Sequence, residues 1–323
     1  MKILMMGTGP FAVPTFEALV DSPHDVCGLI TRPPAGSHRK KRKDINPMRE
    51  SAEQREIGIL DPVSVNAADF APRLRDFEAD LFVVCDYGQI LSSEVLGYSR
   101  LGGINLHGSL LPKYRGAAPI NWALYNGEST TGNTVIWMTP RLDGGPILDR
   151  CELPIEPQDT AITIEEKLSQ LGPASVLRCI ERLQDWDGQE VIGTEQDPAL
   201  ATKAPRLRKA DGQVDWNLSA EKIALQVRAF QPWPGSFSSL QRKDAAGGET
   251  NRLILLAAAV SESVSGTGSP GDVVFADPGK LVVQTGDGQL EITEVQPSGK
   301  KAMPVADFLR GNRVSIGDSF QST

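Results

Sequence analysis

The chain has 323 residues, of which 40% are hydrophobic and 23% are charged. This length predicts about two domains and a core that needs no disulfides or structural metal. With 33 basic and 41 acidic residues, the formal charge of −8 excludes a globally basic nucleic-acid binder but allows a local basic patch. No apolar run approaches the roughly 18 residues of a membrane helix, and no signal or transit segment is recognisable, so we expect a cytoplasmic protein.

Strand-like and helix-like segments alternate in the first half of the chain. We predict strands at 2–6, 26–31, 59–60, 80–85, 103–107 and 134–138, and helices at 10–20, 48–55, 70–77 and 162–183. This alternation is typical of a Rossmann-like α/β fold with a doubly wound parallel sheet.

The second half has a different pattern. Prolines and basic residues between 196 and 211 indicate a linker, and a helix is predicted at 219–230. Short β-like runs at 252–257, 271–275, 280–284 and 290–295, separated by glycine- and proline-rich turns, are typical of a small β-barrel. We therefore predict a catalytic domain at 1–195, a linker at 196–210 and a smaller barrel domain at 211–323.

The first motif is a glycine-rich turn between the first strand and the first helix. Residues 7–12 read Gly-Thr-Gly-Pro-Phe-Ala and match the G-x-G-x-x-A dinucleotide fingerprint. The second strand ends in Thr31 and is followed by Arg32, so the acidic residue of an NAD site is missing, although an arginine could serve a 2′-phosphate. The simpler interpretation is a tight turn that needs glycine.

A second motif combines an amide and an imidazole on one strand. Asn105 and His107 lie at i and i+2, so their side chains point to the same face near the carboxyl end of the strand, where doubly wound folds bind ligands. Both side chains can donate to one oxygen, which would stabilise an oxyanion by roughly 3–4 kcal/mol per donor. The alternative is an ordinary loop histidine that is satisfied by its neighbours.

A carboxylate and a basic run complete the candidates. Asp143 precedes a Gly-Gly turn and, if it lies beside His107, would favour and orient the charged imidazole; a simple turn residue is the alternative. The consecutive basic residues of one loop would contact phosphates, or would merely form a solvated loop. These residues are Arg39, Lys40, Lys41, Arg42 and Lys43.

The segments 105–112 and 115–120 resemble the folate-dependent formyltransferases. The matches at 204–216 (APRLRKADGQVDW), 228–234 (RAFQPWP) and 296–303 (QPSGKKAM) narrow this resemblance to the methionyl-tRNA formyltransferases. The resemblance covers nearly the whole chain. It implies a Rossmann-like domain joined to an OB-like barrel, with no dinucleotide at the glycine-rich turn, and a monomer that needs no metal.

The resemblance also assigns roles to residues. It implies that Asn105, His107 and Asp143 are catalytic, and that the formyl donor is 10-formyltetrahydrofolate. The folate site would be formed by Ser109, Leu110, Leu111, Pro112, Val84, Cys85, Tyr87 and Gly88. The acceptor would be initiator methionyl-tRNA, bound by the basic loop 39–43 and by a basic hinge. The hinge residues are Lys203, Arg206, Arg208 and Lys209.

Three positions depart from the pattern of the family. Asp86 replaces a small apolar residue, Gly144 and Pro146 replace a Thr and an Asp, and the basic loop is shifted. The rival enzymes are an N-formyltransferase for an amino-sugar nucleotide, which shares the core motif, and glycinamide ribonucleotide formyltransferase, which is shorter. A nucleic-acid-binding protein without activity would leave Asn105, His107 and Asp143 unexplained.

Overall fold

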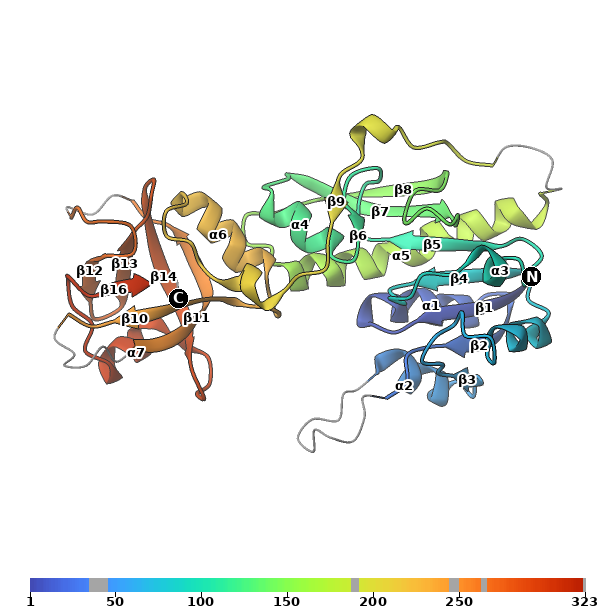
Figure 1. Cartoon of the computed structure of the whole chain (residues 1–323), viewed down its shortest axis with the longest axis horizontal. Coiled ribbons are helices and arrows are strands. Elements are labelled where there is room, and N and C mark those ends of the chain that lie inside the picture. Colours follow the sequence, from blue (N-terminus) through green and yellow to red (C-terminus); the bar gives the residue numbers. More distant parts are fainter. Residues whose placement is uncertain (35–45, 187–191, 244–249, 263–265, 322–323) are drawn as a thin grey trace. The chain divides into compact units, whose positions relative to one another are not determined.

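The computed structural model describes residues 1–34, 46–186, 192–243, 250–262 and 266–321, so the predicted basic loop 39–43 lies outside the described residues. The described chain forms two compact units (Figure 1). The first comprises residues 1–120, 129–155 and 163–205, and the second comprises 121–128, 156–162 and 206–323. None of the described helices is long and apolar enough to span a membrane.

The first unit is built on one mixed sheet. Its strands are β1 (Lys2–Gly7), β2 (Asp25–Ile30), β3 (Ile59–Leu60), β4 (Leu81–Cys85), β5 (Gly103–His107), β7 (Thr130–Trp137) and β8 (Ile147–Pro154). They have the order β3-β2-β1-β4-β5-β7-β8. The first five are parallel, whereas β7 and β8 run antiparallel to their neighbours. The predicted doubly wound arrangement is confirmed, with two antiparallel strands added at one edge.

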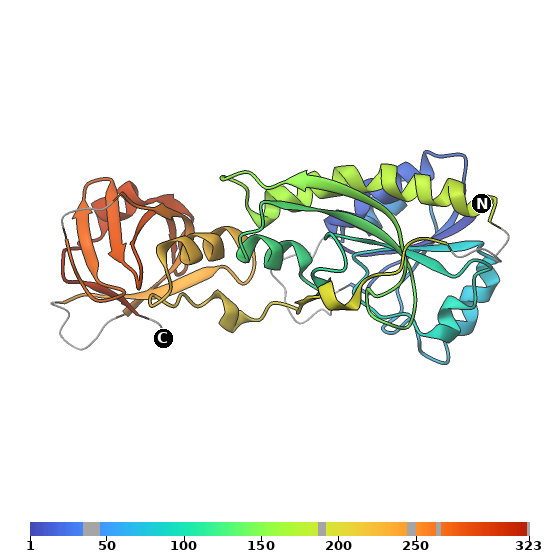
Figure 2. The same cartoon turned by 90° about the horizontal axis from the view of Figure 1, so that it is seen from above.

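Helices cover both faces of this sheet (Figure 2). The helical elements of this unit are η1 (Pro10–Ala12), α1 (Val13–Val20), α2 (Pro47–Gln54), η2 (Ala71–Phe77), α3 (Ser93–Leu96), α5 (Ala161–Gln184) and η3 (Pro198–Leu200). On one face η2 and α3 pack on a core that contains Leu4 and Phe82, while α1 and α5 lie on the other face. The predicted helix at 70–77 is a 3-10 helix, with Pro72 in its first turn.

The polar groups at helix starts follow the sequence. Asn46 caps α2 by accepting a hydrogen bond from the Arg49 amide at 3.1 Å, and Pro47 occupies the first helical position. In β1 and β4, by contrast, apolar residues occupy both faces, as expected for central parallel strands. These strands carry the glycine-rich turn and the Asp86 loop at their carboxyl ends.

Two very short strands of the first unit, far apart in the sequence, pair with each other. These are β6 (Arg115–Gly116) and β9 (Lys203–Ala204), which pair in parallel. The helix α4 (Pro119–Tyr125) follows β6. Because β9 lies within the predicted linker, part of that stretch runs beside Arg115 and Gly116.

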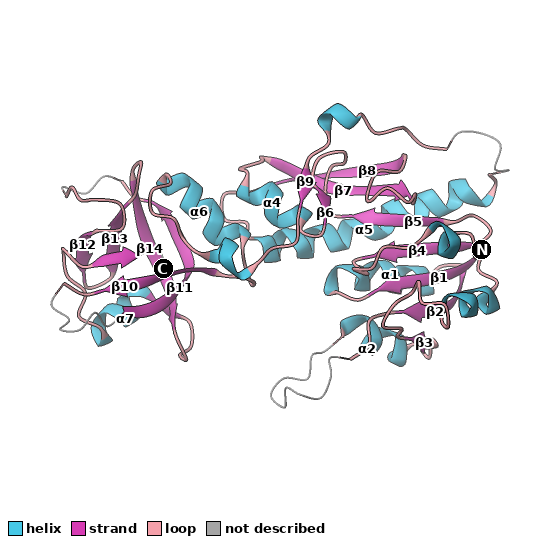
Figure 3. Cartoon of the chain, viewed as in Figure 1, coloured by secondary structure: helices cyan, strands magenta, loops and turns pink. Residues whose placement is uncertain are grey.

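The second unit is a nearly closed antiparallel sheet (Figure 3). Its strands are β10 (Ser236–Gln241), β11 (Thr250–Val260), β12 (Val273–Asp277), β13 (Lys280–Gln284), β14 (Gln289–Pro297), β15 (Met303–Pro304) and β16 (Ser319–Gln321); its helices are η4 (Lys209–Gly212), α6 (Ala220–Ala229) and α7 (Val305–Gly311). The order is β12-β13-β14-β11-β10-β16, with β15 on β14. A bridge between Asp272 and Ser319 brings the two ends together, which confirms the predicted barrel.

Two segments from earlier in the chain pack on α6 and complete this unit. The Asn121 side chain donates to the Ala229 carbonyl at 2.7 Å, and Lys222 donates to the Tyr125 carbonyl at 2.7 Å. Phe230 stacks on Tyr125 with ring centroids 5.0 Å apart. Ser219 caps α6 by accepting from the Lys222 amide at 3.2 Å.

Candidate active site

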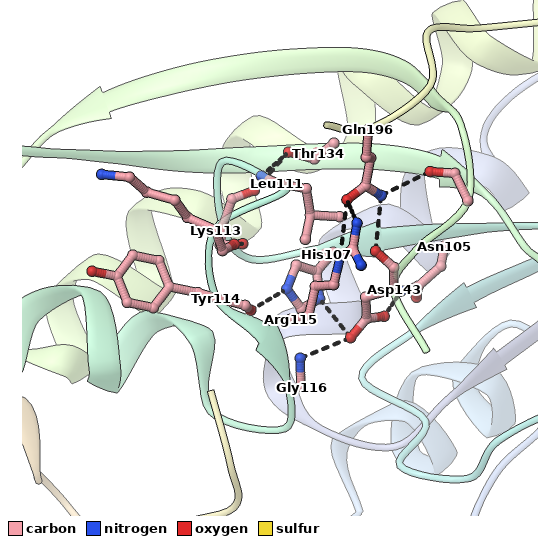
Figure 4. Close-up of polar contacts among 12 residues, drawn as sticks. Asn105, His107, Leu111, Lys113, Tyr114, Arg115, Gly116, Thr134, Asp143 and Gln196 are labelled. Atoms are coloured by element: carbon pink, nitrogen blue, oxygen red, sulfur yellow. Dashed lines mark hydrogen bonds and ion pairs between the residues drawn. The ribbon is translucent and has the colours of Figure 1, made fainter. Parts of the chain in front are cut away.

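The carboxyl end of β5 presents Asn105 and His107 on one face, as the i, i+2 spacing predicts (Figure 4). His107 is 6% exposed, and Asn105 is partly buried. The strand is held between β4 on one side and β7 on the other. The two side chains are therefore fixed by the centre of the sheet and not by a loop.

Asp143 reaches both of these side chains from the turn after β7. Its Oδ1 atom accepts from the Asn105 Nδ2 atom at 3.4 Å, and its Oδ2 atom lies 3.8 Å from His107 Nδ1. Oδ2 also accepts from the Gly116 amide at 2.9 Å. One carboxylate thus touches the amide, faces the imidazole and is anchored by β6 (Figure 4).

The second nitrogen of the imidazole fixes how the ring can act. His107 Nε2 lies 2.9 Å from the Tyr114 carbonyl, which can only accept, so Nε2 carries a hydrogen. The Nδ1 atom faces Asp143 at a distance longer than a hydrogen bond. A hydrogen on Nδ1 in the charged imidazole would therefore remain available to an oxygen of a bound substrate.

The loop 109–112 is fixed by one threonine of β7. The Thr134 hydroxyl donates to the Ser109 carbonyl at 2.6 Å and accepts from the Leu111 amide at 3.1 Å. The Ser109 hydroxyl donates to the Lys113 carbonyl at 2.8 Å. Ser109 and Leu111 are buried, whereas Leu110 and Pro112 are partly exposed and can contact a ligand.

The other predicted folate-site segment follows β4. Val84, Cys85 and Tyr87 are buried and Gly88 is exposed, with the Arg32 guanidinium donating to its carbonyl at 2.9 Å. Burial raises the pKa of the Cys85 thiol well above its usual range, which favours the neutral thiol over the thiolate.

Asp86 is the unusual residue of this loop. Its backbone has a left-handed φ of 44°, and its carboxylate lies over Gly9, where an added Cβ would stand 1.7 Å from Oδ2. The residue keeps an exposed surface, but burial of the carboxyl group, partly offset by Arg32, raises its pKa to about 6. The pKa of Glu165 is raised by burial and then by Asp86. The glycine turn is thus covered by a carboxyl group, which is the opposite of a phosphate cradle.

Two residues for which the sequence predicts no role also belong to this site. Arg115 donates through Nε and Nη2 to the Gln196 side-chain oxygen at 3.1 and 2.7 Å. Gln196 in turn donates to the carbonyls of Asp143 and Gly145 at 2.8 and 2.7 Å. No sequence motif marks these contacts, because they join positions that are 53 and 81 residues apart.

The comparisons with known proteins agree along the whole chain. Residues 1–180 match the formyl transferase family model, and residues 206–313 match that of the formyl transferase C-terminal domain. The methionyl-tRNA formyltransferase of Rhodopirellula baltica is 41% identical over 98% of this chain and 96% of its own, and that of Geobacter metallireducens is 37% identical over 98% and 97%.

The chain belongs to the methionyl-tRNA formyltransferase family. The predicted family and the predicted formyltransferase activity are thereby confirmed. Solved structures agree in fold: a sugar 3N-formyltransferase, WlaRD, covers 93% of this chain with 99% of its own at a TM-score of 0.62 and 18% identity. HypX from Aquifex aeolicus, solved with tetrahydrofolic acid, covers 96% of this chain with 47% of its own at a TM-score of 0.61 and 19% identity.

The basic residues proposed from the formyltransferase resemblance lie on the surface where they are described. Lys203 is exposed on β9 of the first unit. Arg206, Arg208 and Lys209 are exposed at the beginning of the second unit, and the Arg208 amide donates to the Asp211 carboxylate. All four side chains are thus accessible to phosphates in this part of the structure.

Proposed function

We propose that this chain transfers the formyl group of 10-formyltetrahydrofolate to the α-amino group of methionine on initiator tRNA. Relatives that are 35–41% identical over 98% of the chain and are named methionyl-tRNA formyltransferases support the reaction. The observation that carries the catalytic assignment is the convergence of Asn105, His107 and Asp143 through contacts of 3.4 and 3.8 Å.

The neutral amine of the methionyl group attacks the formyl carbon. Its lone pair forms the new C–N bond, and the carbonyl electrons move to oxygen to give a tetrahedral oxyanion. Asn105 has a second Nδ2 hydrogen beside the one directed at Asp143, and His107 has Nδ1; both can donate to this oxygen. The sheet holds these donors in place before the reaction, so little reorganisation is needed.

Asp143 stabilises the charged imidazole and transfers the proton of the attacking amine. It faces the imidazole and stabilises its positive charge while the oxyanion exists. The attacking amine loses a proton, which Asp143 accepts directly or through a water and passes to N10 of the folate as the C–N10 bond breaks. The products are formylmethionyl-tRNA and tetrahydrofolate, and atoms and charge balance.

The folate would contact the loops after β4 and β5. We assign Val84, Cys85, Tyr87 and Gly88 to one side of its site and residues 109–112 to the other. The side chain of Thr134, which fixes residues 109–112, supports a preformed site. The tRNA phosphates would contact the exposed basic hinge residues and the basic loop 39–43.

A panel of acceptors tests the reaction. The enzyme is incubated with 10-formyltetrahydrofolate and with methionyl initiator tRNA, uncharged tRNA or an amino-sugar nucleotide, and formylated product is quantified. We expect product only with the charged tRNA, since its α-amine is the nucleophile. Product with the amino-sugar nucleotide alone would establish the rival N-formyltransferase activity instead.

A further inference from the structure

The Gln196 side chain lies between an arginine and the turn that carries Asp143 (Figure 4). Its amide nitrogen donates to two main-chain carbonyls of the turn, those of Asp143 and Gly145, at 2.8 and 2.7 Å. Its oxygen accepts two hydrogen bonds from Arg115. Gln196 is 8% exposed, so this amide is fully used in a buried position.

The turn that Gln196 holds has an unfavourable backbone. Asp143 has a φ of 47°, a left-handed conformation that costs energy for a residue with a Cβ. Gly145 approaches β7 so closely that an added Cβ would stand 1.7 Å from the Trp137 carbonyl. A turn with such a conformation persists only when its surroundings fix it, and the two bonds from Gln196 do so on the side away from the carboxylate.

The short strand β6 supports both the main chain and the carboxylate of Asp143. Arg115 orients the Gln196 amide, and the neighbouring Gly116 amide donates to Asp143 Oδ2 at 2.9 Å. Arg115 and Gly116 form β6, which pairs with β9. The main chain of Asp143 is therefore held through Gln196, and its carboxylate directly, by neighbouring residues of one strand.

We propose that Gln196 is a positioning residue for the formyl transfer and that it acts through Asp143. By holding the two carbonyls, it places the Asp143 carboxylate against Asn105 and His107. This role rests on the proposed catalytic role of Asp143. Gln196 itself touches no reacting atom, so its loss should slow the reaction without weakening the binding of either substrate.

Two substitutions separate positioning from folding. In Gln196→Glu the carboxylate still accepts both hydrogen bonds from Arg115, but it cannot donate to the carbonyls of Asp143 and Gly145. In Gln196→Ala both sets of bonds are lost. We expect Gln196→Glu to lower the thermal midpoint, because the carbonyls of Asp143 and Gly145 lose their buried donor, but to remain folded at the assay temperature. At that temperature kcat should fall by about 10- to 100-fold, since a misplacement near 1 Å costs about that much.

A control comes from the second unit. Gln231 makes the same pair of bonds, donating to the carbonyls of Val227 and Leu256 at 3.0 and 2.7 Å. Gln231→Glu should leave kcat unchanged, with KM values measured for both substrates in all variants. A kcat of Gln196→Glu within twofold of the unchanged enzyme, or a loss confined to KM, would overturn the proposal.

The double variant with Asp143→Asn tests whether the effect passes through Asp143. If it does, adding Gln196→Glu to Asp143→Asn lowers kcat by no more than about two- to threefold, because coupled residues are not additive. Multiplicative losses would overturn the positioning role and leave the role of Asp143 intact. Normal turnover of Asp143→Asn alone would overturn both.

Discussion

Replacing Asp143 with asparagine removes one negative charge and the Oδ1 atom that accepts from the Asn105 side chain. The side-chain oxygen of the introduced asparagine can still accept from the Gly116 amide, which lies 2.9 Å from Oδ2 in the unchanged protein. The charge lost lies 3.8 Å from His107 Nδ1. With an effective dielectric constant of about 20, that separation corresponds to about 4 kcal/mol between unit charges.

This interaction stabilises the state in which the imidazole is charged and the oxyanion has formed. Its loss therefore raises the activation barrier. A loss of about 4 kcal/mol corresponds to roughly a 10³-fold lower kcat. The folate dissociation constant should change little, because the loops 84–88 and 109–112, which we propose bind folate, make no contact with the carboxylate that the structure records.

The assay is steady-state formylation of methionyl initiator tRNA at saturating 10-formyltetrahydrofolate, with folate affinity measured by fluorescence and folding by thermal unfolding. Asp69→Asn serves as the matched control, since Asp69 is exposed on the surface. If Asp143→Asn retains kcat within tenfold while Asp69→Asn is normal, the reasoning from charge and distance is refuted.

Three further predictions concern Asp86, Thr134 and the basic hinge. Asp86→Asn should raise the thermal midpoint at pH 7.5 but not at pH 4, and equal shifts at both pH values would contradict this. The reason is that the pKa of the Asp86 carboxyl is about 6 in the folded protein, above its usual 3.8, so stability is lost as the pH rises between these two values. Thr134→Val removes the hydrogen-bond partner of the Ser109 carbonyl and of the Leu111 amide, so we expect a free energy of unfolding in urea that is lower by about 1–3 kcal/mol, and a higher KM for folate. An unchanged KM would show that the loop 109–112 does not need Thr134. Neutralising the basic hinge should raise KM for tRNA and flatten its dependence on salt, and an unaltered salt slope would remove this surface from the tRNA site. The hinge variant changes Lys203, Arg206, Arg208 and Lys209.

Periodicity in the sequence was sufficient for much of the fold. The apolar spacing of residues 162–183 predicts a long helix, and the structure has α5 at Ala161–Gln184. No strand was predicted at 147–154, where β8 lies. The direction of β7 was not predictable either, because a strand pattern reports which side chains are buried and not which way the chain returns. The 3-10 form of residues 71–77 likewise depends on packing that local spacing does not reveal.

In the site, too, local spacing predicts some contacts and not others. Asn105 and His107 share a strand, so their proximity follows from a two-residue spacing. The approach of Asp143 to His107 across 36 residues was implied only by the family resemblance, and the structure places the atoms 3.8 Å apart. Arg115 lies in a segment of the family resemblance, but no role could be predicted for it or for Gln196, since an amide that holds main-chain carbonyls can occupy any sequence context.

The make-up of the second unit has a practical consequence for anyone who recombines these enzymes. Residues 121–128 and 156–162 belong to the same compact unit as the barrel, where Asn121 bonds to Ala229 and Arg228 donates to the carbonyls of Glu156, Pro157 and Asp159. A fragment that begins at residue 206 would expose Phe230, leave Arg228 without its acceptors and leave the Ala229 carbonyl without its donor. Chimeras between homologous enzymes should therefore exchange three stretches of gene together, and a barrel expressed alone is expected to aggregate.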